Sequence, residues 1–334
     1  MMHDENILEV RDLHKHFPIK GKGIFSKTVG HVKAVNGVSF ELKAGESLGL
    51  VGESGCGKTT LGRCILRAIN PTKGDVLYKS ANEDEHLITE LKYKELWSVR
   101  PEMQMIFQDP YSSLNPRMTI QQIVGEPLIC NKLLKGKELK DRIVELVEMV
   151  GLDSRHLERY PHAFSGGQRQ RIGIARALAT NPRLLVCDEA VSALDVSVQA
   201  QILNLLLDLQ KRLGFSYIFI SHDLGVIRHV SDRVAVMYVG KIVELGNTED
   251  VYHNPLHPYT QSLLAARPIN DPRKKVKRIQ LQGEVANPAN PPSGCFFHPR
   301  CPNCVDACKK SPQKLREVRP NHFVLCDQLQ HGEV

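Results

Sequence analysis

Short apolar runs that end in polar residues recur along this chain, and they predict the buried strands of an α/β fold. These runs lie at 47–50, 103–107, 184–187 and 217–220. Further strands are predicted at 7–18, 34–42, 234–238 and 241–245, and the last two of these form a hairpin. Residues 20–33 hold three glycines and four lysines, so we expect an exposed loop there.

Helical spacing of apolar residues fills the stretches between these strands. It predicts helices at 59–69, 165–179 and 198–213. Residues 119–159 carry a charged helical pattern in which Ile143 and Leu146 belong to one apolar face, so we expect a helical insertion that interrupts the sheet.

Composition describes a globular chain without a membrane span of its own. Its 334 residues, of which 42% are hydrophobic, can form a large buried core in two or three domains. The formal charge of +7 permits contact with acidic lipid or nucleic acid without requiring either. No run approaches the ~20 apolar residues of a membrane span, so we expect a soluble, cytosolic protein. The basic run 272–278 is expected to be a solvated linker or an acidic-lipid contact.

The stretch after the first apolar run predicts a phosphate-binding loop, because it fits G-x-x-x-x-G-K-[ST] between a strand and a helix. It comprises Val51-Gly52-Glu53-Ser54-Gly55-Cys56-Gly57-Lys58-Thr59-Thr60. The glycines let successive N–H groups point inward, and the helix that opens at Lys58 adds its positive N-terminus. ATP fits such a site, with Lys58 on its β- and γ-phosphates and the Thr59 hydroxyl on Mg²⁺.

A second anion-binding device follows later in the chain, at Ser165-Gly166-Gly167-Gln168. A serine and two glycines that open a helix leave backbone N–H groups available at its positive end. Two such devices in one chain require an explanation that the pattern alone does not supply.

Polar side chains stand directly after three predicted buried strands. Asp188 and Glu189 follow one of them, Gln108 follows another and His222 follows a third. In doubly wound sheets, ligands bind at the carboxyl ends of the strands. We therefore expect Asp188 to hold Mg²⁺ through water, Glu189 to polarise the attacking water and His222 to contact the γ-phosphate. Gln108 taken alone is more typical of a surface residue.

The order of these motifs, with Asp195 between the acids and His222, resembles that of the ATP-binding subunit of an ABC transporter. The resemblance implies a RecA-like core, an antiparallel β subdomain and a helical subdomain at about 110–175, all within an ATPase domain at 1–250. It also implies that two subunits sandwich two ATPs, each between the phosphate loop of one subunit and the Ser165 helix of the other.

The same resemblance assigns roles that the residues alone do not. It implies that Phe17 stacks on adenine, that Gln108 joins Thr59 and Asp188 around Mg²⁺, and that Asp195 belongs to the nucleotide site. The chain departs from the family at Ala190, where a proline usually follows the catalytic glutamate, and this could loosen how Glu189 is held.

Residues 251–334 resemble the C-terminal extension of dipeptide and oligopeptide importer ATPases, through segments such as Asn254-Pro255-Leu256-His257-Pro258-Tyr259-Thr260. Five of the nine cysteines crowd this extension, and in a cytosolic chain that indicates metal rather than disulfides. The family pattern includes Cys295, Cys301, Cys308 and Cys326, and Cys304 is not part of it. Four thiolates suit a [4Fe–4S] cluster, which we favour, but tetrahedral Zn²⁺ accepts four sulfurs equally well.

The resemblance implies an ATPase subunit that energises uptake of dipeptides or oligopeptides at the cytoplasmic face of the cell (inner) membrane. The implied partners are transmembrane permease subunits, a second related ATPase subunit or another copy of the chain, and indirectly an external solute-binding protein, with no nucleic acid. Importers of nickel or another small solute stay open as an alternative. A soluble ABC ATPase acting on nucleic acid or ribosomes is disfavoured, because the sequence has one set of motifs and no sustained heptads.

Overall fold

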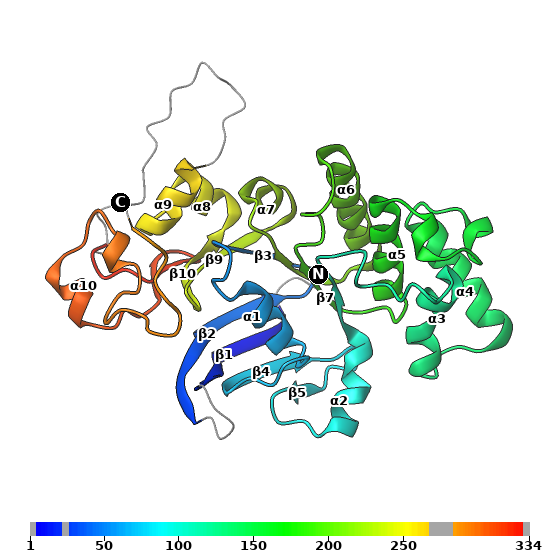
Figure 1. Ribbon diagram of the computed structural model, residues 1–334, viewed down its shortest axis with the longest axis horizontal. Coiled ribbons are helices and arrows are strands. Elements are labelled where there is room, and N and C mark those ends of the chain that lie inside the picture. The colour runs from blue at the N-terminus through cyan, green and yellow to red at the C-terminus, as the bar shows by residue number, and fades with distance from the viewer. Residues whose placement is uncertain (1–4, 22–26, 267–282, 330–334) are drawn as a thin grey trace, which may run out of the picture. The chain divides into compact units, whose positions relative to one another are not determined.

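The computed structural model describes residues 5–21, 27–266 and 283–329, which form two compact units (Figure 1). Unit 1 comprises the chain up to Leu8, Leu42–Ser47 and Tyr78–Ile220. Unit 2 comprises Glu9–Glu41, Leu48–Leu77 and the chain from Ser221 onward. The basic run at 272–278 lies outside the described residues.

A parallel β-sheet forms the core of unit 1. Its strands lie in the order β8 (Ser216–Ile220), β7 (Leu184–Asp188) and β6 (Met103–Ile106), and the unit also holds the short strand β5 (Glu85–Leu87). Every residue of β7 and β8 is buried, as expected for parallel strands covered on both faces. The runs at 184–187 and 217–220 are therefore buried strands as predicted. The run at 103–107 is a strand only to Ile106, with its two middle residues half-buried, and Phe107 is exposed.

Helices connect the strands of unit 1, and some of them pack on the sheet. They are α2 (Tyr93–Val99), α3 (Ile120–Cys130), α4 (Gly136–Met149), α5 (Gly166–Leu178) and α6 (Val196–Leu213). Helices α3, α4 and α5 pack on one another, so a helical group stands where the charged helical pattern predicts it (Figure 1, green). Helix α4 buries Ile143, Leu146 and Val147, and the first two of these are the residues predicted for its apolar face.

Unit 2 contains a mixed sheet in the order β3, β9, β10, β12 and β11. Strand β3 (Ser47–Val51) runs parallel to β9 (Arg233–Tyr238), and β10 (Lys241–Asn247) returns antiparallel to β9. The predicted hairpin at 234–245 is therefore confirmed. The helices of this unit are α1 (Lys58–Ile65), α7 (Leu224–Val230), α8 (Thr248–His253), α9 (Pro258–Ala265) and α10 (Asp306–Lys310).

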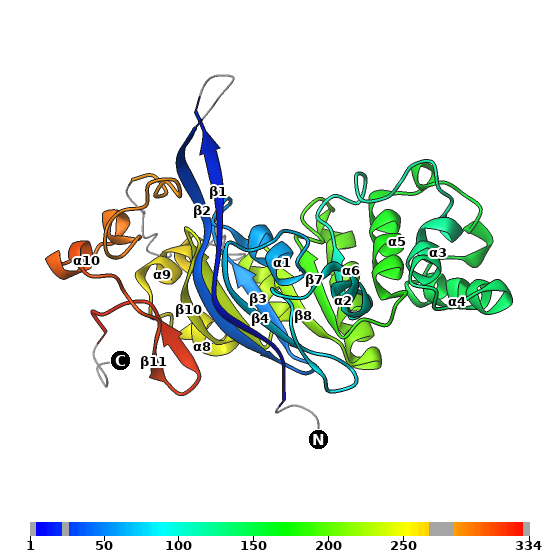
Figure 2. The same cartoon turned by 90° about the horizontal axis from the view of Figure 1, so that it is seen from below.

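A second sheet places β1 (Asn6–Lys20) between β2 (Thr28–Lys43) and β4 (Lys73–Lys79), and Figure 2 shows β1 and β2 running side by side as two long strands. Strand β2 begins at Thr28, so the prediction of a loop over 20–33 is wrong in its second half. The β-branched residues Thr28, Val29 and Val32 favour extended backbone there despite the neighbouring glycine and lysines.

The hairpin of β11 (Arg316–Arg319) and β12 (His322–Val324) was not predicted from the sequence. Strand β12 pairs antiparallel with β10, with Glu244 opposite Val324. The only local signal for this hairpin is the turn at Pro320-Asn321, where Asn321 adopts a left-handed φ of 58°.

A fully buried carboxylate fastens this hairpin to the rest of unit 2. Glu244 accepts the backbone N–H groups of Leu256 at 2.8 Å and His257 at 2.9 Å. The Nε2 atom of His322 donates to Glu244 at 2.8 Å, and both side chains have 0% exposure. A buried carboxylate is tolerated only when its oxygens are hydrogen-bonded, and these three donors provide those bonds.

The described part of the chain contains no helix with the length and apolar character that crossing a membrane requires.

We predict that His322→Ala lowers the free energy of unfolding by about 3 kcal/mol, because it leaves a buried carboxylate short of one donor. Chemical denaturation measures this loss. The matched control is Asp306→Asn, which breaks the exposed pair between Lys309 and Asp306 in the same part of the chain and should leave unfolding unchanged. Equal stability of His322→Ala and wild type would contradict the role given to this pair.

Candidate functional site

The phosphate loop of unit 2 connects β3 to α1 through three glycines that no other residue could replace without strain. Gly52, Gly55 and Gly57 have φ values of 152°, 79° and 106°. A Cβ atom on Gly57 would lie 1.9 Å from the Ala34 carbonyl oxygen, and one on Gly52 would lie 2.1 Å from that of Met237. The loop therefore closes against neighbouring backbone, which fixes its path.

Lys58 opens α1 and folds back over this loop. Its side chain is buried, and its Nζ atom donates to the carbonyl oxygens of Gly52 at 2.7 Å and Glu53 at 3.1 Å. Ser54 and Gly55 are exposed, whereas Thr59 and Thr60 are half-buried in the first turn of α1. Burial raises the pKa of the Cys56 thiol, which is therefore neutral.

Two further predicted residues belong to unit 2. Phe17 lies on β1 with 37% of its surface exposed, and the Lys15 ammonium lies 5.0 Å from its ring centroid. His222 is exposed and directly precedes Asp223, which caps α7 by accepting the Gly225 N–H at 2.6 Å. The short α7 thus fixes the backbone beside His222.

Unit 1 brings Gln108 and Glu189 together at the carboxyl ends of β6 and β7. The register pairs Ile106 with Cys187, so the residues after each strand are neighbours. The Gln108 amide Nε2 donates to the Glu189 carboxylate at 3.0 Å, and Asp188 is buried beside it in the chain. Glu189 holds a left-handed φ of 47°, and its N–H donates to the Ile220 carbonyl at 3.0 Å.

A capping box forms the start of α5. The Ser165 hydroxyl accepts the Gln168 N–H at 3.3 Å, and the Gln168 side chain accepts the Ser165 N–H at 3.0 Å. Gly166 and Gly167 begin the helix, and a Cβ atom on Gly167 would lie 2.4 Å from Val198. Asp195 caps α6 by accepting the Val198 N–H at 3.0 Å, and this hydrogen bond lowers its pKa.

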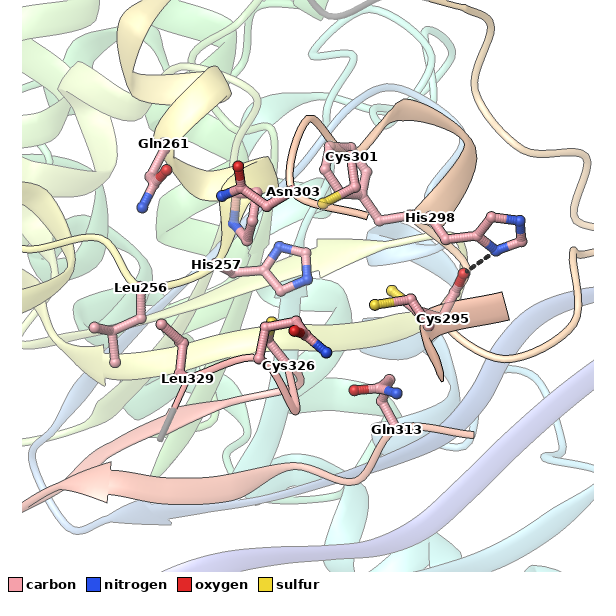
Figure 3. A pocket seen from close by; sticks show the side chains of 14 residues that line it. Leu256, His257, Gln261, Cys295, His298, Cys301, Asn303, Gln313, Cys326 and Leu329 are labelled. Carbon is pink, nitrogen blue, oxygen red and sulfur yellow. Dashed lines mark hydrogen bonds between the residues drawn. The ribbon is translucent and has the colours of Figure 1, made fainter. Parts of the chain in front are cut away.

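One pocket of unit 2, of about 90 Å³, is lined by four cysteines (Figure 3). They are Cys295, Cys301, Cys308 and Cys326. Cys304 does not line it, and its thiol faces the Val305 carbonyl oxygen at 3.6 Å. The four residues that the family pattern selects therefore surround one cavity, and the fifth does not.

Hydrogen bonds to cysteine carbonyl groups hold the backbone around this pocket. The Cys295 N–H donates to the Cys308 carbonyl at 2.8 Å, and Arg316 donates to the Cys326 carbonyl at 2.9 Å. Burial raises the pKa of Cys295 to about 11 and raises those of Cys301 and Cys326, so without a cation these groups are neutral thiols.

The four sulfurs do not form a site for a single metal ion. Within residues 5–21, 27–266 and 283–329, no three His, Cys, Asp or Glu side chains are grouped so that they could hold one. Tetrahedral zinc needs its sulfurs about 2.3 Å from the metal, whereas an iron–sulfur cluster binds each cysteine to a different iron and so accepts wider spacing.

A glycine loop that leads into a helix, an Asp-Glu pair at the end of a buried strand and a glutamine bonded to that glutamate are the components of an ATP-hydrolysing P-loop protein. The comparisons place the chain within that class. Residues 35–192 match the family described as ABC transporter, and residues 243–308 match the oligopeptide/dipeptide transporter C-terminal region.

Curated relatives match almost the whole chain. The oligopeptide transport ATP-binding protein AppF of Bacillus subtilis is 53% identical over 96% of this chain and 97% of its own length. The dipeptide transport ATP-binding protein DppF of Haemophilus influenzae is 48% identical over 96% of each chain. A solved dimeric structure of the ATP-binding cassette MJ0796, bound to ADP and Pi, matches 72% of this chain and 98% of its own with a TM-score of 0.62 and 28% identity.

The chain therefore belongs to the ABC transporter family, as an ATP-binding subunit with the oligopeptide/dipeptide transporter C-terminal region. It is an ATPase of mixed α/β fold.

Two residues contact the phosphate loop without having been predicted from the sequence: Tyr259 on α9 and Arg300 in the turn before Cys301. Both lie in the C-terminal part of the chain, far from the loop in sequence. The preference of a buried arginine for a carboxylate partner is general, but nothing in the local pattern identifies which carboxylate it is.

We predict that Gly57→Ala lowers the thermal unfolding midpoint more than Gly55→Ala does, in protein without nucleotide. Both glycines have positive φ, which costs another residue about 1–2 kcal/mol. A Cβ atom at Gly55 meets nothing within 4 Å, whereas one at Gly57 meets backbone at 1.9 Å. Equal midpoints for the two variants would show that the loop is free to move away from Ala34.

Proposed function

We propose that this chain is the ATP-hydrolysing subunit of an importer that carries dipeptides or oligopeptides across the cytoplasmic membrane. The observation that supports this most is similarity to AppF along nearly the whole chain, including the C-terminal region as well as the cassette. An importer of nickel or another small solute remains the alternative function, because the solute is selected outside this subunit.

The proposed ATP site combines the phosphate loop with side chains from several other motifs of the chain. Lys58 exchanges its bonds to the loop carbonyls for the β- and γ-phosphates, and the N–H groups of residues 55–60 cradle them. Phe17 stacks on the adenine ring. The Thr59 hydroxyl and Gln108, with Asp188 through water, would hold Mg²⁺, which would supply positive charge to neutralise the charge that develops on the phosphates.

Hydrolysis then depends on Glu189. Its carboxylate polarises the attacking water, and the bond from Gln108 holds that carboxylate at the end of β7. His222 contacts the γ-phosphate. Ala190 leaves Glu189 without the rigid proline that usually follows it, but the hydrogen bond from the Glu189 N–H to Ile220 supplies a fixed backbone position.

The second anion-binding device serves a second subunit. The N–H groups at the start of α5, together with Ser165 and Asp195, complete the ATP site of a partner cassette. The partner is either a related ATPase subunit or another copy of this chain. The dimeric MJ0796 structure with ADP and Pi supports this arrangement by similarity.

The pocket of four cysteines holds a [4Fe–4S] cluster in this proposal. Its ligands are Cys295, Cys301, Cys308 and Cys326, which all line one cavity although no three of the described side chains suit a single ion. When bound, the cluster supplies positive charge that keeps the four groups as thiolates and links residues 295–326. Zinc is the alternative, and it requires the sulfurs to move closer together.

The chain works as a peripheral subunit on the cytoplasmic face of the membrane, with permease subunits that span it and an external solute-binding protein that delivers the cargo. The division into an ATPase domain at 1–250 and an extension at 251–334 is part of the same proposal. Isolation from membranes in mild detergent, followed by identification of the companion chains, tests this assembly directly.

We predict that Glu189→Gln reduces ATP hydrolysis and peptide uptake by the reconstituted transporter at least 100-fold while ATP binding survives. The amide oxygen can still accept the bond from Gln108 but cannot polarise water. Glu145→Gln, which changes an exposed glutamate of the same unit, is the control. Hydrolysis by Glu189→Gln at the wild-type rate would remove Glu189 as the base, and uptake of nickel instead of peptides would establish the alternative cargo.

We predict that the chain purified without oxygen is brown and contains iron and acid-labile sulfide in equal amounts. Serine at any of the four pocket cysteines should release both, whereas Cys304→Ser should retain them, because Cys304 lies outside the pocket. Elemental analysis and visible absorption measure the outcome. Zinc without iron would disprove the cluster but keep the site, and loss of metal on Cys304→Ser would disprove the ligand assignment.

A further inference from the structure

The C-terminal part of unit 2 contacts the phosphate loop at Glu53, a residue of that loop. Arg300 approaches the Glu53 carboxylate with both ends of its guanidinium group, at 2.9 Å from Nη1 to Oε2 and 3.1 Å from Nη2 to Oε1. The Arg300 side chain is 7% exposed and that of Glu53 is 27% exposed. A two-bond Arg–carboxylate pair of this kind is directional, and its burial reduces screening by water.

The backbone of the same residue is held independently. The Glu53 N–H donates to the Tyr259 hydroxyl at 2.9 Å, and the Tyr259 side chain is fully buried. The side chain and the peptide of Glu53 are thus both bound by residues that lie more than 200 positions further along the chain.

An aromatic cluster fixes these two partners. The rings of Tyr238, Tyr259 and Phe297 contact one another with centroid distances of 4.7, 5.3 and 5.5 Å. The Arg300 guanidinium lies 5.9 Å from the Tyr238 ring and 6.0 Å from the Phe297 ring. Because the cluster restricts the rotamers of Tyr259 and Arg300, they can hold Glu53 in one position instead of following its motion.

We infer that Arg300 and Tyr259 are positioning residues for the phosphate loop, and that the C-terminal region thereby sets the affinity of this ATPase for nucleotide. The inference rests on the proposed binding of ATP at Lys58. A glycine-rich loop can sample many conformations where its residues are not anchored, and the apparent affinity for a ligand falls as the fraction of loops in the binding-competent conformation falls. Glu53 adjoins Gly52, so anchoring Glu53 limits the freedom of the glycine that opens the loop.

The contacts of Lys58 strengthen this argument. Its Nζ atom donates hydrogen bonds to the carbonyl oxygens of Gly52 and Glu53. The position of these two peptides therefore also determines where the Lys58 ammonium group lies before nucleotide binds. Arg300 and Tyr259 contact Glu53 and are assigned no contact with the nucleotide. Their effect should therefore fall on binding and leave the chemical step largely unchanged.

The experiment measures the Kd of ATP, and the KM and kcat of hydrolysis, for the purified full chain and its variants. Tyr259→Phe removes only the hydroxyl and should raise the Kd about fivefold, the effect of about one hydrogen bond. Arg300→Met should raise it about tenfold or more, because the bonds lost are to a charged group. Arg300→Lys should recover part of the loss, since it retains the charge without the two-bond geometry. KM should rise in parallel while kcat stays within about twofold.

A double-mutant cycle tests whether Glu53 transmits the effect. Glu53→Ala should raise the Kd about as much as Arg300→Met, and the double variant should be no weaker than either single one. Matched controls are Arg228→Met and Tyr252→Phe, because Arg228 lies over the Tyr252 ring and pairs at 2.9 Å with Glu249, a carboxylate that does not belong to the phosphate loop. Both controls should bind ATP as the wild type does.

Wild-type Kd values for Arg300→Met and Tyr259→Phe, with unchanged unfolding midpoints, would overturn the inference. Additive effects in the cycle would overturn it as well, because Arg300 would then act by another route. If Arg300→Met fails to fold, Tyr259→Phe and Arg300→Lys decide the question by the same criteria. A wild-type chain that binds no ATP, or a Lys58→Ala variant that binds it equally well, would instead contradict the proposed function.

Discussion

The burial of one carboxylate, that of Glu244, determines how the C-terminal half of unit 2 is assembled. Removing an ionised carboxylate from water costs several kcal/mol even after relaxation of the protein, so its oxygens must be bonded. The donors come from two peptides before α9 and from His322 on β12. Satisfying this single group therefore brings three separated segments to the edge of the sheet at once.

The turn that satisfies Glu244 also orients the residues that follow it. His257 is completely buried, and burial lowers its pKa to about 4, so its ring is neutral near pH 7. Its Nδ1 atom accepts the Tyr259 N–H at 3.1 Å, which starts α9. The Tyr259 hydroxyl then reaches the Glu53 N–H, and His257 itself lines the cysteine pocket. One buried turn thus connects the sheet, the pocket and the phosphate loop within unit 2.

The sequence predicted the elements whose signals are local, and missed those that depend on distant partners. The glycine spacing and the Asp188-Glu189 pair after an apolar run identify their positions because loop and strand chemistry require those residues there. The family pattern, rather than any local signal, separates the four pocket cysteines from Cys304. In contrast, β11 and β12 are short, β11 is polar, and their pairing depends on β10 and on Glu244, about 80 residues away.

The partner of Arg300 could not be predicted from the sequence either. Its neighbours in sequence, Phe297 and Cys301, mark a cysteine-rich segment and give no sign of a partner in the phosphate loop. Only the fold brings Arg300 to Glu53, across a separation of 247 residues. The resemblance to known ATPases did not supply this contact either, because it assigns the loop to nucleotide and the extension to a separate site.

The pairing of Glu53 with Arg300 constrains how such a chain can change over evolutionary time. A charged group on one side cannot be replaced alone without leaving the other poorly compensated in a mostly buried position. Recombination that exchanged the C-terminal region between related subunits would separate the two residues and succeed only where the incoming segment carried a matching cation. The ATPase cassette and its extension are therefore expected to be inherited together rather than exchanged separately between related proteins.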